Sequence, residues 1–150
     1  MKGQMKFITL FCLGALALAS CIPAETTAAI VKPTEDAKVD QFLTVDGESQ
    51  LLPDGSVIWV VVFLPRTGMY YPQNDPAAMQ ANGEWTAVAY IGQENESGLA
   101  ADVIAVVADK SAQNAFRSYL SEARDKQNYS GMASLPSGAV IYDRVRVVRK

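Results

Sequence analysis

Long apolar blocks separated by turn-forming residues dominate the chain after residue 40, and they predict β-strands. The strongest block is Val57 to Leu64, eight consecutive apolar residues that end at Pro65. A run of β-branched and aromatic residues of this length is typical of a strand buried on both faces, so we expect it at the centre of a sheet. Two further apolar blocks, 85–91 and 102–108, predict two more strands, and 139–148 predicts the last one.

The pattern before residue 46 is weaker. Gln41 to Val45 predicts a shorter strand that the turn formers Asp46-Gly47 close, with Ile30-Val31 as a candidate partner. Residues 21–38 are mostly Ala, Thr, Pro, Glu and Lys, a composition that buries too little apolar surface to order itself. We therefore expect a flexible tether over 21–38 and one folded domain over 39–150, a size that supports a single core without disulfide or metal staples.

An amphipathic helix is predicted between the last two strands, over 109–124. Apolar residues recur there at spacings of three and four, which places them on one stripe of a helix. They are Ala112, Ala115, Phe116, Tyr119, Leu120 and Ala123. Asp109 or Ser111 is positioned to cap the start of the helix. The sequence thus predicts a mainly β fold, a β-sandwich with one amphipathic helix before the last strand.

The N-terminal residues have the pattern of a secretory signal. Lys2 and Lys6 precede the apolar run Phe7 to Leu18, which is too short to span a bilayer. The sequence Leu18-Ala19-Ser20-Cys21 resembles the lipobox of bacterial lipoproteins. That resemblance implies a signal peptide over 1–20, cleavage before Cys21, a diacylglycerol on the Cys21 thiol and usually an acyl chain such as palmitate on the new amine. Two or three chains hold a protein on a membrane because each buried methylene contributes about 0.8 kcal/mol.

Two alternatives to lipidation exist, an ordinary signal peptidase that leaves Cys21 as a free thiol and a retained membrane helix. Cys21 is followed by Ile22 and not by aspartate, which in enteric bacteria resembles the outer-membrane sorting signal. We expect a lipid-anchored protein of the bacterial cell envelope, in the outer membrane and facing the periplasm or the exterior if the organism is Gram-negative.

Composition narrows the chemistry of the mature chain. Two of the 13 basic residues leave with the signal while all 16 acidic residues remain, so the net charge falls from −3 to −5, and this charge argues against nucleic acid as a partner. The chain has no histidine, so a Ser/His/Asp or Cys/His catalytic group cannot form. The other cysteine, Cys12, lies in the signal, which leaves no disulfide within the mature chain.

Part of the domain resembles bacterial immunoglobulin-like modules. Pro33 to Val39 and Val45-Asp46-Gly47 are similar to the first strands of such modules, and Trp59 stands where they carry a core tryptophan. Four other segments, 70–73, 85–92, 108–109 and 141–144, are similar to an uncharacterised bacterial domain of envelope proteins. The resemblance implies an immunoglobulin-like β-sandwich, and a role in adhesion, spacing or binding more often than in catalysis.

The segment 66–76 is the main candidate for a ligand or partner contact. It carries Tyr70 and Tyr71 beside Gln73, and aromatic faces next to amide groups suit glycans and peptides. Trp85 is a further candidate contact residue. The alternative is structural, with the tyrosines covering an edge of the core and the prolines fixing the loop.

Acidic residues offer two weaker candidates. Residues 94–98 are oxygen-rich, but they supply only the first part of a calcium loop, so a solvated hairpin is the simpler interpretation and we expect no metal. Asp102, Asp109 and Asp143 flank predicted strands, and they would have to face each other across a cleft to hydrolyse a glycoside. Capping a helix or ending a strand is their ordinary use.

Charged and apolar residues alternate in the last predicted strand, so Arg144 and Arg146 lie on the same face of it. We expect these arginines to pair with acids on a neighbouring strand, and guidance of an acidic partner is the alternative. For the whole protein we expect a non-catalytic binding or structural module without a cofactor, whose partners are the membrane and an envelope protein or glycan. The alternatives are an inhibitor that presents the Tyr70-Tyr71 loop as a convex tip, and a small carboxylate-dependent hydrolase.

Overall fold

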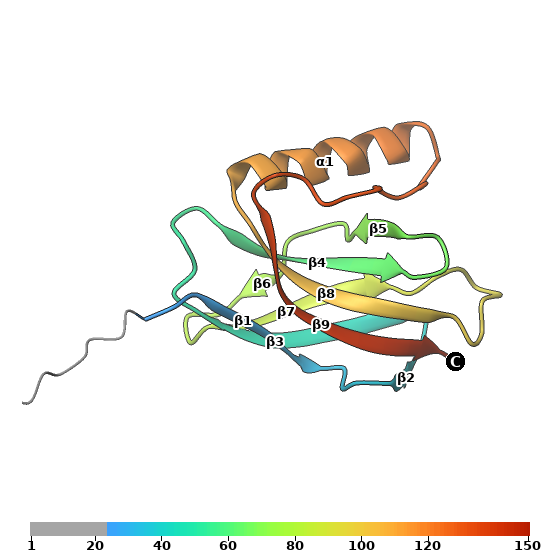
Figure 1. Ribbon diagram of the computed structural model, residues 1–150, viewed down its shortest axis with the longest axis horizontal. Coiled ribbons are helices and arrows are strands. Elements are labelled where there is room, and N and C mark those ends of the chain that lie inside the picture. Colours follow the sequence, from blue (N-terminus) through green and yellow to red (C-terminus); the bar gives the residue numbers. More distant parts are fainter. Residues whose placement is uncertain (1–23) are drawn as a thin grey trace, which may run out of the picture.

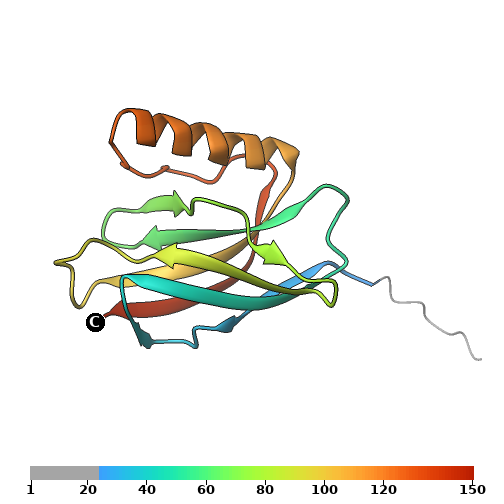
Figure 2. The ribbon, with the colours of Figure 1, turned by 180° about the vertical axis from the view of Figure 1, so that it is seen from behind.

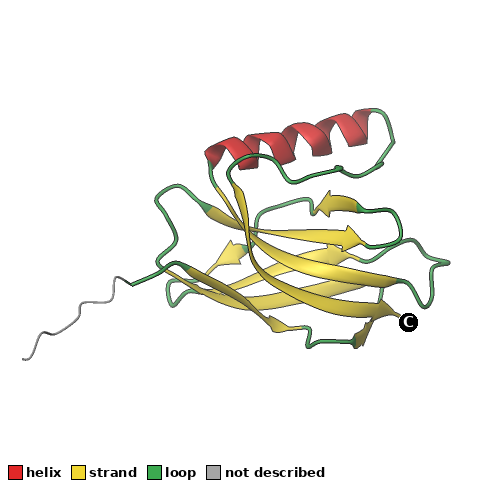
Figure 3. Ribbon diagram, in the orientation of Figure 1, coloured by secondary structure: helices red, strands yellow, loops and turns green. Residues whose placement is uncertain are grey.

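The computed structural model describes residues 24–150, which are mainly β with one helix (Figure 3). The strands are β1 (Thr27–Lys32), β2 (Ala37–Val39), β3 (Phe42–Gln50), β4 (Val57–Leu64), β5 (Met69–Pro72), β6 (Ala78–Met79), β7 (Glu84–Tyr90), β8 (Ala100–Ala108) and β9 (Ala139–Arg149). The helix α1 (Lys110–Asp125) lies between the last two strands. The signal over 1–20 and the lipidation of Cys21 lie outside the described residues.

Two sheets pack face to face, and α1 runs along one side of them (Figures 1 and 2). The first sheet has the order β1-β3-β7-β6, and the second has the order β2-β9-β8-β4-β5. This is the strand order of the immunoglobulin sandwich, with β5 as an additional edge strand beside β4 and β2 as an extra edge strand parallel to β9. The prediction of a β-sandwich with one helix before the last strand is confirmed.

The folded domain begins earlier than predicted. Residues 27–38 were expected in a flexible tether, but β1 pairs with β3 and β2 pairs with β9. Only two side chains of β1, Ala28 and Ile30, pack against the core. Two apolar positions are too few to distinguish a strand from a flexible segment by composition. β3 is the predicted partner of β1, although the pairing uses its second half, from Asp46 to Gln50.

The turn predicted at Asp46-Gly47 is absent, because β3 continues through both residues. Gly47 lies directly opposite Trp85 on β7. A Cβ atom at this position would overlap the Trp85 indole ring and the backbone oxygen of Ala29. Glycine is therefore needed here for close packing of a large side chain and not for a turn.

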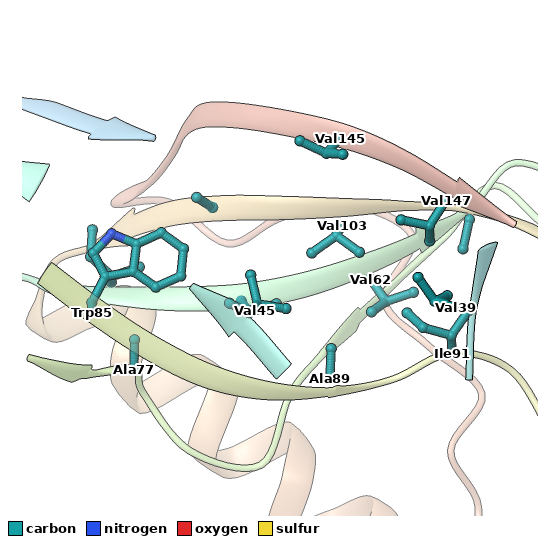
Figure 4. Packing of buried hydrophobic residues seen from close by; sticks show 14 of the residues in the cluster. Val39, Val45, Val62, Ala77, Trp85, Ala89, Ile91, Val103, Val145 and Val147 are labelled. Atoms are coloured by element: carbon teal, nitrogen blue, oxygen red, sulfur yellow. The ribbon is translucent and has the colours of Figure 1, made fainter. Parts of the chain in front are cut away.

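The core between the sheets is built from alternate residues of the facing strands (Figure 4). Trp85, Val45 and Ala89 come from the first sheet, and Val103 and Val147 come from the second. All five side chains are buried. The predicted alternation of the last strand is confirmed, since Val145 and Val147 point into this core while Arg144 and Arg146 are exposed.

The helix forms a third layer over the outer face of the second sheet. Its start is capped as predicted by Asp109, whose carboxylate accepts a hydrogen bond from the Ala112 N–H at 2.9 Å. Phe116 packs on Trp59 with ring centroids 5.2 Å apart. Trp59 therefore points towards the helix and not between the sheets, where the immunoglobulin resemblance had placed it, and Trp85 is the tryptophan of the intersheet core.

Within residues 24–150, no helix has the length and apolar content needed to cross a membrane.

Candidate ligand-binding cleft

A cleft of about 530 Å³ is lined by the last residues of β4, β5 and β7 and by residues that follow these strands. Its apolar floor includes Val62 and Leu64 of β4. Four tyrosines from four separate segments line it, and they are Tyr71, Tyr90, Tyr119 and Tyr129. The cleft therefore joins both sheets, the second half of α1 and the loop that follows it, and a cleft with an apolar floor and convergent polar groups is the usual form of a ligand site.

Strand pairing determines which tyrosine of β5 faces the cleft. Tyr71 lies opposite Val62 and so takes the inner face of the second sheet. Tyr70 lies opposite Phe63 and takes the outer face, where its ring packs on Phe63 with centroids 4.8 Å apart. Successive side chains of a strand point to opposite faces, so only one of the two adjacent tyrosines can reach the cleft.

The side chain of Gln73 connects the two sheets at the back of the cleft. Its Oε1 accepts a hydrogen bond from the Tyr90 N–H at 2.7 Å, and its Nε2 donates to the Tyr71 carbonyl at 2.9 Å. The backbone oxygen of Gln73 also accepts from Trp59 Nε1 at 2.8 Å. Because Gln73 is 6% exposed and both ends of its amide are bonded, it positions two cleft tyrosines and is not free to bind a ligand.

The loop after α1 holds the back of the cleft through Tyr119. The Tyr119 hydroxyl accepts a hydrogen bond from the Gly131 N–H at 3.0 Å, and burial raises the pKa of this hydroxyl. Gly131 has a φ of +81°, and a Cβ there would lie 2.9 Å from the Tyr71 ring. Glycine at 131 thus allows the loop to pack closely against the tyrosine of β5.

The mouth of the cleft carries one ion pair between the two sheets. Arg66, in the turn between β4 and β5, pairs with Glu96, in the loop between β7 and β8. The Arg66 guanidinium and the Gln93 N–H both bond to the Glu96 carboxylate, and they lower its pKa. The two charges of the cleft lining therefore neutralise each other.

The other polar groups of the lining remain available. Within the described part of the chain, no protein group is hydrogen-bonded to the hydroxyls of Tyr71, Tyr90 and Tyr129 or to the side-chain amides of Asn74 and Gln93. Tyr90 and Tyr129 are also exposed, by 44% and 54%. The cleft thus offers several neutral donors and acceptors beside aromatic faces.

The predicted contact residues separate in the structure. Tyr71 lines the cleft, and its role as a ligand contact stays a prediction. Gln73 reaches the cleft but bonds to backbone groups, Tyr70 lies on the other face of its strand, and Trp85 is buried in the core with 1% of its surface exposed. The segment 69–72 is an edge strand and not a projecting loop, so it does not form the convex tip that an inhibitor would present.

Sequence reasoning missed three of the four cleft tyrosines. Tyr90 ends β7, Tyr119 stands at the margin of the helix stripe, and Tyr129 lies in a loop. Only Tyr119 could have been noticed in the sequence, because it stands at the margin of an otherwise apolar helix stripe. A tyrosine in such a position is typical of the boundary between the core and solvent, where its ring is buried and its hydroxyl is accessible.

The three acids considered for hydrolysis have separate structural partners. Asp102 is 4% exposed and lies near both Arg144, at 3.4 Å, and Arg146, at 3.3 Å, which confirms the predicted pairing of these arginines with an acid on a neighbouring strand. Asp109 caps α1, and Asp143 accepts the Ile30 N–H at 2.7 Å. Among residues 24–150, no group of three or more His, Cys, Asp or Glu side chains is placed to hold a metal ion.

The strand order and the third helical layer define the chain as an immunoglobulin-type β-sandwich with a helix in the final hairpin. No protein-family model matches the chain, and no curated protein resembles it at a significant level.

Proposed function

We propose that this protein is an envelope lipoprotein, anchored through a lipid on Cys21, whose sandwich binds a ligand in the tyrosine cleft without transforming it. The observation that carries the proposal is the convergence of Tyr71, Tyr90, Tyr119 and Tyr129 on one cleft. Among the described residues, no group bonds to the hydroxyls of three of these tyrosines. Tyrosine supplies broad contact area at a small cost in side-chain entropy, which is why binding surfaces are enriched in it.

The position of the cleft fits an anchored protein. β1 begins with Thr27 paired to Gln50, at one end of β3, and Tyr90 pairs with Phe42 at the other end. A strand advances about 3.3 Å per residue, so the cleft lies roughly 26 Å from the start of β1. β1 begins on the left of Figure 1, and β4 and β7 end on the right. A lipid on Cys21 therefore leaves the cleft on the side away from the membrane.

A lipid on Cys21 would also limit the distance between the domain and the membrane. Five residues separate Cys21 from β1, and six extended peptide units span at most about 20 Å. We infer that the sandwich stays close to the membrane surface, which is the outer membrane if the organism is Gram-negative, and that the cleft lies within about 50 Å of the lipid, the sum of the two lengths.

The test is photo-cross-linking in living cells that process lipoproteins. Benzoylphenylalanine in place of Tyr129 stands at the mouth of the cleft, and the same residue in place of Val140 is the matched control, because each position is 54% exposed. Val140 lies opposite Val107 near the end of β8, at the other end of the sandwich. We expect cross-linked adducts when the probe is at position 129, and we expect the additional change Tyr90→Ala to suppress them. The probe at position 140 should give none of these adducts. Equal adducts at both positions, or none at 129, would contradict the proposal.

A further inference from the structure

An aromatic surface continues from the cleft onto the outer face of the first sheet. Tyr90 lines the cleft and also pairs with Phe42 on β3, with ring centroids 4.7 Å apart. Val88 stands two residues earlier on the same strand face, about 7 Å away along β7. Phe42 is 62% exposed and Val88 is 55% exposed. A ligand that fills the cleft and passes over Tyr90 would therefore meet a second apolar platform outside it.

The chemistry of the cleft favours a neutral ligand. The charges in its lining, Arg66 and Glu96, are paired with each other. The free groups are phenolic hydroxyls and the amides of Asn74 and Gln93, each of which both donates and accepts hydrogen bonds. Sugar hydroxyls have the same double capacity, and the faces of sugar rings are apolar enough to stack on Tyr90 and Phe42.

The sheet edge beside the cleft disfavours an extended peptide. A peptide that adds to a sheet needs free backbone N–H and C=O groups on the edge strand. On β5 the outward N–H and C=O of Tyr70 already bond to Met132, at 2.9 and 2.8 Å, and Pro72 has no N–H to offer. The backbone of β5 is therefore closed to strand addition where it borders the cleft.

From these observations we infer that the ligand is a neutral oligosaccharide, held by its end or a middle ring in the tyrosine cleft and extending over Tyr90 to a second stacking position on Phe42. The inference rests on the proposed function, because it names the ligand class of the same cleft. It adds that the ligand is a chain of several rings, since Phe42 is not among the residues that line the cleft and a further ring outside the cleft would stack on it.

The test uses the lipoprotein purified in a zwitterionic detergent, because glycosidic detergents would compete for the site. The probes are immobilised neutral oligosaccharides of one to six rings, taken from glucans, mannans, galactans and N-acetylglucosamine polymers. We expect at least one series to be retained, with affinity that rises as the chain grows. Tyr71→Phe removes a cleft hydroxyl and should weaken every length of that series.

Phe42→Ala separates the two positions. Loss of one stacking contact should weaken chains of three or more rings by about 2- to 13-fold, since an aromatic contact contributes roughly 0.5–1.5 kcal/mol. Binding of single sugars should not change. Leu51→Ala is the matched control, because Leu51 is 58% exposed but follows the other end of β3, and it should leave every affinity unchanged.

Three outcomes would overturn the inference: retention of no neutral saccharide, an equal effect of Phe42→Ala on single sugars and long chains, or cleft-dependent adducts at Tyr129 that consist only of protein. The last outcome would leave the proposed binding function intact and replace its ligand class. An absence of any adduct at Tyr129 together with an absence of saccharide binding would instead remove the proposed function itself.

Discussion

At the scale of single residues, hydrogen bonds divide similar side chains into different roles. Gln73 was a candidate ligand contact because amides beside tyrosines suit a binding site, and the structure uses the same amide to join Tyr71 and Tyr90 across the two sheets. A sequence does not show which groups an amide faces. Its partners are 2 and 17 residues away in the chain, and only the packed sandwich brings them together.

The two tryptophans give a matched pair for testing these assignments. Both are fully buried, but Trp59 Nε1 donates to the Gln73 carbonyl, whereas Trp85 Nε1 has no partner among the described residues. Trp59→Phe and Trp85→Phe remove the same volume, and only the first leaves an acceptor unpaired. We expect Trp59→Phe to be the more destabilising by about 1–3 kcal/mol, measured by urea unfolding. Equal losses would show that the hydrogen bond from Trp59 to the Gln73 carbonyl does not stabilise the fold.

The ion pair at the cleft mouth predicts a pH dependence. The Glu96 pKa is lowered below its ordinary value of 4.5, chiefly by the hydrogen bond from Arg66. A lowered pKa in the folded state means that Glu96 stabilises the fold above pH 4.5 and that this contribution disappears as the pH falls through the folded pKa. The difference in unfolding midpoint between the wild type and Glu96→Gln should be constant near neutral pH and shrink towards zero in acid.

Glu94→Gln is the control for this titration, since Glu94 is exposed in the same loop and has no ion-pair partner among the described residues. It should follow the wild-type profile. A Glu96→Gln protein whose profile also matches the wild type at every pH would exclude a stabilising role for the pair.

At the scale of elements, long apolar patterns were predictable and short ones were not. β4 begins and ends where its pattern predicts, and α1 has both the predicted stripe and the predicted Asp109 cap. β1 was predicted only in part, as a candidate strand at Ile30-Val31, because only Ala28 and Ile30 pack inwards and alanine carries little signal. The turn predicted at Asp46-Gly47 was wrong because glycine occurs both in turns and in strands where a large side chain packs closely. The sequence does not show that Trp85 lies opposite Gly47.

The cap of α1 can be tested directly. Asp109→Ala removes the acceptor of the Ala112 N–H and should lower the free energy of unfolding by about 1 kcal/mol. Asp125→Ala, at the exposed end of the same helix, should change it by less than about 0.5 kcal/mol because it removes no cap. The measurement is urea unfolding followed by circular dichroism, and an Asp109→Ala protein as stable as Asp125→Ala would contradict the cap.

At the scale of the whole molecule, the fold class followed from the pattern and the cleft did not. A cleft lined by β5, β7, α1 and the loop after it depends on how four segments meet in space. Each tyrosine alone has an ordinary explanation as a residue at the margin of the core. Their convergence depends on strand order and on the turn lengths, which the strand patterns leave undecided.

The proposed anchor and the cleft lie towards opposite ends of the sandwich. The described chain enters the sheets at the start of β1, and the cleft lies at the far end of β3 and β7. If Cys21 is lipidated as proposed, the short segment before β1 would keep the sandwich near the membrane, and the cleft would face away from it.

The most direct test is the intact mass and membrane fractionation of the protein expressed in a lipoprotein-processing host, beside Cys21→Ser. The account predicts a mature wild-type chain that begins at Cys21, carries acyl chains and sediments with the outer membrane, and a variant that is unlipidated and either soluble or left as precursor. A wild-type protein without acyl chains in the soluble fraction would contradict the account, because nothing would then fix the cleft relative to a membrane.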